Sequence, residues 1–184
     1  SPVWFASSVV VYGSNNKPLK ESFDRNPISY YALSKYLCEN AGKFYCDNFK
    51  VNVGIMRIFS TFGPGLKKLV VFDTIKKIKS KGSFKVFGTG NEIRDLAFVD
   101  DQVRTISLLT KKIKKPQGDI YNIAAGKPYT IKSVVKKLVK ISKKQISFEF
   151  TNKRRSFDTK NFIADKSKTN KIISELNLDF VISS

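Results

Sequence analysis

Apolar and polar residues follow one another in blocks along the first third of the chain, in an order that predicts strands joined through a helix. The segments 3–11 and 51–59 are apolar and rich in β-branched residues, so both are predicted to be buried strands. Between them, the polar segment 14–27 predicts a loop, and apolar residues at helical spacing predict a helix over 29–48. This order favours an α/β protein whose sheet is parallel and has crossover helices.

Turn clusters divide the rest of the chain into shorter elements, which predict a smaller lobe of mixed strands and helices. Glycine-containing turns fall at 62–65 and 88–91, and the second leads into the apolar segment 93–99. Thr130 is a predicted helix cap, because its side-chain oxygen can accept a hydrogen bond from an amide in the first turn. Helices are predicted at 70–80, 103–112, 130–142 and 167–176, and strands at 84–87, 119–123 and 146–150.

The chain carries a large excess of positive charge, most of it from lysine. Of 184 residues, 34 are Lys or Arg and 15 are Asp or Glu, which gives a formal net charge of +19. The lysines are spread along helical segments, as is typical of solvated faces, and no nucleic-acid recognition motif accompanies them. We therefore expect no nucleic-acid partner. No apolar run approaches the roughly 18 residues of a membrane span, so no membrane partner is expected either.

The residue types exclude several kinds of catalytic site. The chain has no histidine, so it holds no Ser-His-Asp or Cys-His unit, and no metal site is expected. Cys38 and Cys46 lie eight residues apart in one predicted helix, about 12 Å along its axis, which is too far for a disulfide. Two reduced cysteines in a helix core, with no visible secretion signal, predict a cytoplasmic location.

Tyr31 and Lys35 are the candidates for acid–base chemistry. Their spacing of four places both side chains on one face of the predicted helix. Tyrosine is a poor base at its ordinary pKa of about 10. A neighbouring ammonium group favours the phenolate and lowers that pKa. The spacing alone does not separate this interpretation from a core tyrosine beside a solvated lysine.

Six motifs occur in the order found in one enzyme family and cover nearly the whole chain. The chain thereby resembles the extended short-chain dehydrogenase/reductases, and within them the UDP-glucose 4-epimerase-like members of the NAD-dependent epimerase/dehydratase family. The motifs are FASSVVVYG at 5–13, YALSK at 31–35 with Glu39 following, RIFSTFGPG at 57–65, GTGNEIRD at 88–95 with FVDD at 98–101, NIAAG at 122–126, and Arg154-Arg155 with Asp158.

The resemblance implies a fold as well as a function. Residues 1–65 and 96–126 would form the C-terminal half of a Rossmann-type, NAD-binding parallel sheet. Residues 66–95 and 127–184 would form a smaller mixed α/β lobe that binds a nucleotide-sugar. The family often dimerises through the helix that carries Tyr31, so a homodimer is a further expectation.

Individual roles follow from the same resemblance. Tyr31 would take a proton from a sugar hydroxyl, Ser8 would hydrogen-bond the same oxygen, and Lys35 would hold the nicotinamide ribose and lower the pKa of Tyr31. These three residues and Phe59 would contact NAD. Guanidinium forks are well shaped for a diphosphate. The implied substrate contacts are Ser60, Val86, Phe87, Arg94, Arg155 and Asp158, with the diphosphate assigned to Arg94 and Arg155, the ribose to Asp158 and the base to Val86 and Phe87.

Simpler interpretations remain open for several of these residues. Ser8 could satisfy a backbone group at the end of a strand, and Phe59 could be a core residue. Arg94 could form a structural ion pair with Asp95, and Arg154-Arg155 could be an ordinary surface pair.

The sequence departs from the family pattern at three places. The glycine-rich dinucleotide loop is absent, and the family places it upstream of Ser1, so we expect this chain to be the C-terminal portion of a longer enzyme and inactive by itself. Ser60 stands where the family usually has Asn. Val9 and Val10 stand where the family's dehydratases carry an acidic pair.

Valine cannot transfer protons, so the third departure favours 4-epimerisation through a 4-keto intermediate. The alternatives are a nucleotide-sugar dehydratase or reductase of the same family, and a non-enzymatic basic binding protein that keeps the scaffold.

Overall fold

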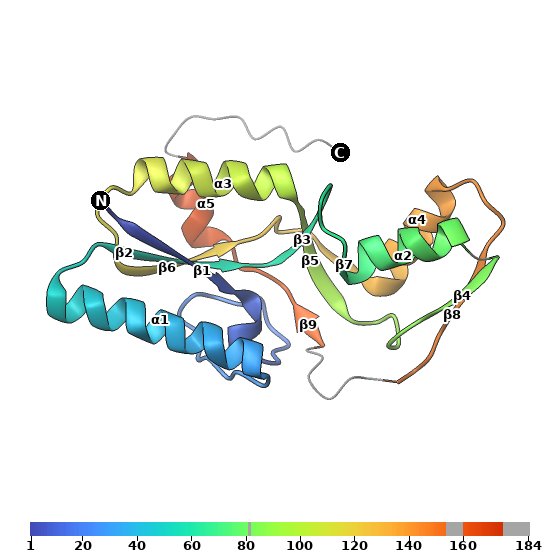
Figure 1. Cartoon of the computed structure of the whole chain (residues 1–184), viewed down its shortest axis with the longest axis horizontal. Coiled ribbons are helices and arrows are strands. Elements are labelled where there is room, and N and C mark those ends of the chain that lie inside the picture. Colours follow the sequence, from blue (N-terminus) through green and yellow to red (C-terminus); the bar gives the residue numbers. More distant parts are fainter. Residues whose placement is uncertain (81, 154–159, 175–184) are drawn as a thin grey trace.

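The computed structural model describes residues 1–80, 82–153 and 160–174, which form a helix-covered sheet with a smaller lobe beside it (Figure 1). Three parallel strands make the main sheet in the order β1-β2-β6, with β1 at Val3–Ser8, β2 at Val53–Ile58 and β6 at Gln117–Ile123. The crossover helix α1 (Tyr30–Phe49) covers one face, and α3 (Val99–Lys112) and α5 (Ser167–Ser174) cover the other. The predicted α/β architecture with a parallel sheet is confirmed.

Side-chain size decides how closely α1 approaches the sheet. A Cβ atom at Gly42 would come within 3.1 Å of the Phe5 ring and of the Val53 side chain, so a larger residue would have to push these neighbours aside. On the opposite face, buried apolar residues of β2, β6 and α3 pack together, with Trp4 against them. The members of this cluster are Met56, Leu109, Tyr121 and Ile123.

The smaller lobe holds two short sheets and two helices. One sheet runs β3-β5-β7, with β9 also paired to β5, and the other pairs β4 with β8. Apolar side chains of β4, α2 and α4 form the core of this lobe, and Phe84, Val86, Ile78 and Val135 are buried in it. The elements are β3 (Ser60–Phe62), α2 (Leu69–Ser80), β4 (Ser83–Val86), β5 (Ile93–Phe98), β7 (Pro128–Thr130), α4 (Ile131–Ile141), β8 (Ser147–Phe150) and β9 (Asn161–Phe162).

Several boundaries differ from the sequence predictions. The strand predicted over 3–11 ends at Ser8, because Val9–Tyr12 forms a 3-10 helix, η1, that buries Val9, Val11 and Tyr12. Helix α3 begins at Val99, four residues early, where Asp100 and Asp101 favour a helix start. The strands β3, β7 and β9 are two or three residues long, too short to show a periodic pattern.

Side-chain caps begin two of the helices, and both cysteines lie on α1. Thr130 Oγ1 accepts a hydrogen bond from the Ser133 amide at 3.1 Å, so the predicted cap is confirmed. Ser29 caps α1 in the same way through the Ala32 amide, which places Tyr31 in the first helical turn. Both cysteines are free, as expected, but Cys38 is exposed, so its predicted place in the core is wrong.

A buried ion pair joins α1 to the main sheet. Arg57 donates through Nε and Nη2 to the two carboxylate oxygens of Glu39, at 2.9 and 2.7 Å, and both side chains are essentially inaccessible. Ser7 Oγ donates to the same carboxylate at 2.5 Å. Burial by itself would lower the pKa of the Arg57 guanidinium. The hydrogen bonds that it donates to Glu39, and the negative charge of that carboxylate, raise the pKa instead. Glu39 and Arg57 therefore remain a charged pair inside the fold.

Arg57→Met is expected to lower the free energy of unfolding by about 3–5 kcal/mol, because it leaves the Glu39 carboxylate buried without its cation. The matched change Lys85→Met removes the cation of the exposed pair with Glu149 and should cost less than about 1 kcal/mol. Urea unfolding followed by the fluorescence of Trp4 measures both variants. Equal losses would contradict the importance assigned to the buried pair.

Candidate active site at the carboxyl end of the parallel sheet

The carboxyl ends of β1 and β2 meet beside the smaller lobe (Figure 1). Ser8 is the last residue of β1, and Phe59 and Ser60 directly follow β2. In open parallel sheets, ligands bind outside the carboxyl ends of the strands. This edge of the sheet is therefore the candidate site.

Tyr31 and Lys35 lie beside the same end of β1. Lys35 Nζ donates a hydrogen bond to the Ala6 carbonyl at 2.8 Å and lies 5.9 Å from the centroid of the Tyr31 ring. Tyr31 is 57% exposed, so its phenol is open to a ligand. The predicted sharing of one helix face is confirmed, while the catalytic roles of the two residues stay predictions.

The bond to Ala6 is made on the outer edge of β1. Val3 donates its amide to Asn52 beside β2, so every second residue of β1 faces β2 and Ala6 faces the other way. An ammonium group has three donors, and Ala6 accepts one of them. The remaining donors, with the exposed phenol, are of the kind that ribose hydroxyls require, so these residues fit the nicotinamide end of NAD.

Ser8 does not behave as a serine that satisfies the end of a strand. Its backbone is extended, and its side chain makes no capping hydrogen bond to η1, the element that follows it. The residue is half-buried. The structure thus weakens the simpler interpretation, although the predicted contact to a substrate oxygen is not tested.

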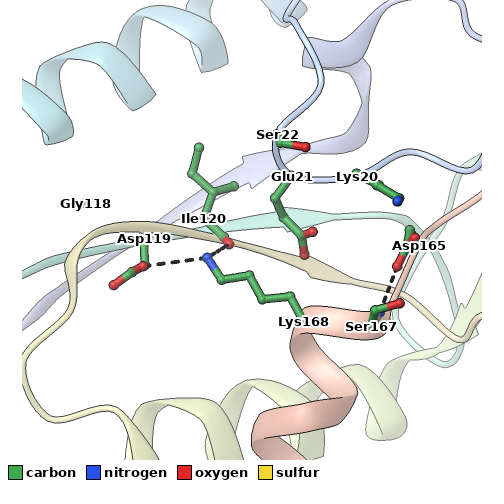
Figure 2. Close-up of a pocket in the computed structure, with 9 residues that line it drawn as sticks. All are labelled: Lys20, Glu21, Ser22, Gly118, Asp119, Ile120, Asp165, Ser167 and Lys168. Atoms are coloured by element: carbon green, nitrogen blue, oxygen red, sulfur yellow. Dashed lines mark hydrogen bonds and ion pairs between the residues drawn. The ribbon is translucent and has the colours of Figure 1, made fainter.

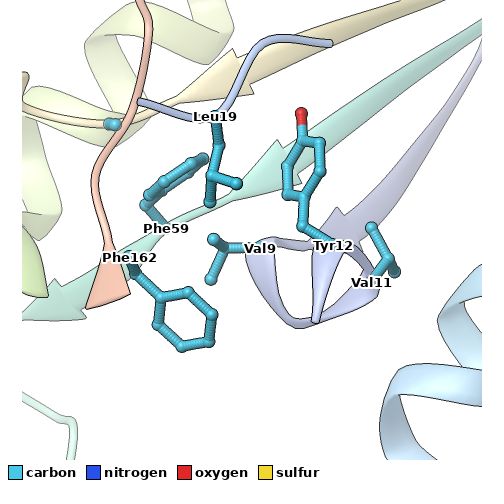
Figure 3. Packing of buried hydrophobic residues seen from close by; sticks show 7 residues of the cluster. Val9, Val11, Tyr12, Leu19, Phe59 and Phe162 are labelled. Carbon is cyan, nitrogen blue, oxygen red and sulfur yellow. The ribbon is translucent and has the colours of Figure 1, made fainter. Parts of the chain in front are cut away.

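Val9 and Phe59 belong to one apolar cluster (Figure 3). Both are buried, at 4% and 3% exposure, and pack with Leu19 and Phe162. The core interpretation of Phe59 therefore holds for its side chain, and its contact to NAD stays a prediction. Val9 is apolar and cannot transfer a proton. An acidic group in its place would be desolvated by this cluster.

The predicted substrate residues are distributed over the smaller lobe. Ser60 is half-buried at the start of β3, Val86 lies in the core of the lobe, and Phe87 is 41% exposed. Arg94 donates to the carbonyls of Ile93 and Lys160 at 2.9 and 3.2 Å, and its guanidinium stacks 4.9 Å from the Phe162 ring. Arg155 and Asp158 lie outside the described residues.

Asp95 binds backbone amides instead of forming the structural ion pair with Arg94 that the sequence left open. The side chain is completely buried and accepts hydrogen bonds from the amides of Ala125 and Gly126, each at 3.0 Å. Burial raises the pKa of its carboxyl group, and the backbone amides oppose that rise. The carboxylate joins β5 to the loop that follows β6, and so joins the smaller lobe to the main sheet.

Two buried polar connections escaped the sequence analysis. In the sequence, Glu39 stands out only as part of a motif, and no motif includes Gln102. Gln102 accepts from Thr61 Oγ1 at 2.5 Å and donates to the carbonyl of Ile123 at 3.3 Å, which holds β3 beside the end of β6. The available signal was a polar residue on an otherwise apolar face, since such a group needs a partner when it is buried.

Two cavities lie away from this site. One, of about 520 Å³, opens on the outer edge of β6, where Lys168 Nζ donates to the Ile120 carbonyl and Glu21 accepts the Asn122 amide, both at 2.9 Å (Figure 2). The other, of about 640 Å³, lies between α3 and α5 beside Gly126. Neither is lined by Ser8, Tyr31 or Lys35.

The described residues show neither a transmembrane helix nor a metal cluster. None of the helices in the described ranges is both long and apolar enough to span a bilayer. Within the same ranges, no group of three acidic or sulfur ligands is placed to hold a metal ion.

A parallel sheet with crossover helices, and a Tyr-Lys pair beside the end of its first strand, define a Rossmann-type fold of the short-chain dehydrogenase kind. The chain belongs to the NAD dependent epimerase/dehydratase family, whose model matches residues 1–124.

Known relatives agree with this assignment. A UDP-glucuronate 4-epimerase of Thermodesulfobacterium geofontis (strain OPF15) is 30% identical over 174 residues, which are 92% of this chain and 52% of the relative. A UDP-glucuronic acid 4-epimerase from Bacillus cereus, solved with UDP-glucuronic acid and NAD, is 26% identical, with a TM-score of 0.86 over 93% of this chain and 55% of that one.

A third relative also has a solved structure. The UDP-N-acetylglucosamine 4-epimerase from Methanobrevibacter ruminantium M1, solved with UDP-N-acetylmuramic acid, is 29% identical, with a TM-score of 0.83 over 93% of this chain and 56% of that one. The chain therefore spans about half the length of the relatives it matches.

Tyr12 is expected to make stability depend on alkaline pH. Burial raises the pKa of its phenol from 10.0 to about 12, against the opposing charge of Arg57. The folded state therefore keeps a proton that the unfolded state loses, so stability is full below pH 10 and falls as the pH rises toward 12.

Urea midpoints measured across this range should fall less steeply in Tyr12→Phe than in the parent. Burial also raises the pKa of the Tyr121 phenol to about 12. Tyr121→Phe is therefore the matched variant. If the urea midpoint of Tyr12→Phe falls with pH as steeply as that of the parent, the pKa of the Tyr12 phenol is not raised in the folded state.

Proposed function

We propose that this chain is part of an NAD-dependent enzyme that inverts C4 of a nucleotide-activated sugar through a 4-keto intermediate. The observation that carries the proposal is the exposed Tyr31 phenol, with Lys35 one turn further along α1, beside the strand that ends at Ser8. Membership of the epimerase/dehydratase family and the 4-epimerases among its relatives support it.

Each residue of the triad has a separate task in this proposal. Tyr31 takes the proton of the C4 hydroxyl and later returns it. The Lys35 ammonium binds ribose hydroxyls beside the phenol of Tyr31. Ser8 hydrogen-bonds the C4 oxygen and holds it toward the phenol. When bound, NAD supplies a reversible acceptor for the hydride of C4.

The apolar residues after Ser8 favour epimerisation over dehydration. Elimination of water needs an acid and a base near the sugar, and Val9 and Val10 supply neither. Without an acid–base pair at these positions, elimination is disfavoured, and return of hydride to the other face of the ketone completes the reaction.

The remaining assignments complete the proposed substrate site. Residues 1–65 and 96–126 are the cofactor-binding part, with Phe59 beside the cofactor. Residues 66–95 and 127–184 bind the nucleotide-sugar, and a homodimer in the cytoplasm stays a prediction. The proposed substrate contacts are Ser60, Val86, Phe87, Arg94, Arg155 and Asp158.

Tyr31→Phe in the intact gene product is expected to lower kcat by about 10²–10⁴-fold, because the reaction loses its acid–base group. UDP-glucuronate is the first substrate to test, and the interconversion of C4 epimers is the measurement. Tyr30→Phe is the matched control, since its side chain is 92% exposed and precedes the catalytic position by one residue. Equal activities in the two variants would refute the role of Tyr31.

The products separate epimerisation from the alternatives. An epimer of unchanged mass, with no net consumption of reduced cofactor, is expected. Accumulation of a product lighter by one water would indicate a dehydratase, and steady consumption of NADH or NADPH would indicate a reductase.

A further inference from the structure

Glu39 lies on the same face of α1 as Tyr31 and Lys35, because the three residues follow one another at intervals of four. Their burial differs sharply. Tyr31 is 57% exposed, Lys35 is half-buried and Glu39 is 1% exposed. The face that carries the proposed catalytic pair therefore runs from the open end of the sheet into the core. A carboxylate at the buried end of that face requires charged or polar partners.

The partners of Glu39 lie on both strands that end at the candidate site. One carboxylate oxygen accepts hydrogen bonds from Ser7 Oγ on β1 and from Arg57 Nε on β2, and the other accepts from Arg57 Nη2. Ser7 directly precedes Ser8. The carboxylate thus fixes α1 to the residue next to the proposed catalytic serine.

Arg57 extends the same constraint to the other side of Ser8. Its guanidinium lies 4.4 Å from the centroid of the Tyr12 ring, and the Tyr12 hydroxyl donates to Asn122 Oδ1 at 2.7 Å. Tyr12 ends η1, the short helix that begins directly after Ser8. Ser8 therefore lies between two residues, Ser7 and Tyr12, that each contact the buried ion pair.

Local structure does not provide this constraint by itself. The connection from Tyr12 to α1 is a long segment without regular helix or strand, and such a segment fixes the position of a helix poorly. Ser8 makes no capping bond that would orient its own side chain. Besides apolar packing, two hydrogen bonds attach α1 to the end of β1, one from Lys35 to the Ala6 carbonyl and one from Ser7 to Glu39.

We propose that Glu39, paired with Arg57, is a positioning residue that sets the separation between the Ser8 hydroxyl and the Tyr31 phenol. This proposal rests on the proposed function, which makes these two groups act on one oxygen. A misplacement of about 1 Å can cost about 100-fold in rate. Neither charge touches the substrate, so the effect falls on kcat and leaves KM near its parent value.

The test is made in the intact gene product and compares Glu39→Gln with a variant that is destabilised elsewhere. Leu109→Ala is the control, because Leu109 is completely buried on the α3 face of the sheet, opposite α1. Glu39→Gln is expected to lower kcat by about 100-fold and to change KM by less than about twofold. Leu109→Ala should lower the urea midpoint while its folded protein keeps the parent kcat. Equal losses of kcat in both variants would overturn the proposal.

Ser7→Ala decides the question if Glu39→Gln does not fold. It removes the hydroxyl that joins β1 to Glu39 and leaves the ion pair in place. A smaller loss of kcat than in Glu39→Gln, about tenfold, is expected with KM unchanged. A parent-like kcat in this variant would overturn the proposal.

An inactive intact gene product would overturn the proposed function instead. The positioning proposal is then tested by crystal structures of the parent and of Ser7→Ala. An increased separation of Ser8 Oγ and Tyr31 Oη in the variant supports positioning, and an unchanged separation overturns it.

Discussion

The ion pair between Glu39 and Arg57 is the interaction on which the arrangement of this molecule depends. Two opposite charges removed from water are tolerated only when they meet in good geometry and their remaining hydrogen-bonding groups are satisfied. Here the guanidinium binds the carboxylate through two nitrogens, and Ser7 and the Glu21 carbonyl satisfy further groups. Because the partners come from α1, β1 and β2, the requirement to satisfy both charges determines how these elements pack.

The polar connections form one continuous network through the sheet. Tyr12 stacks on Arg57 and donates to Asn122, whose amide group in turn donates to the carbonyls of Leu19 and Asp165. Segments from both ends of the chain thereby meet beside β6. The outer edge of β6 is also covered by side chains, since Lys168 and Thr169 bind outward-facing carbonyls and Glu21 binds an outward-facing amide. Covered in this way, the edge is a poor template for a further strand.

The smaller lobe is joined to the sheet by buried polar side chains and not by apolar packing alone. Asp95 binds the amides after β6, and Gln102 binds groups at the ends of β3 and β6. Both residues lie at the boundary between the smaller lobe and the main sheet. The position of the smaller lobe relative to Ser8 and Tyr31 is therefore set by directional hydrogen bonds, which tolerate little displacement.

The sequence by itself determined the main elements, because hydrophobic periodicity reports burial on one side of a helix or strand. It predicted the parallel sheet, the α1 face shared by Tyr31 and Lys35, and the cap at Thr130. Tertiary structure alone decided the end of β1 at Ser8 and the partners of Glu39, Asp95 and Gln102. Those contacts join residues far apart in the chain, and one buried polar residue in a sequence does not name the residue that satisfies it.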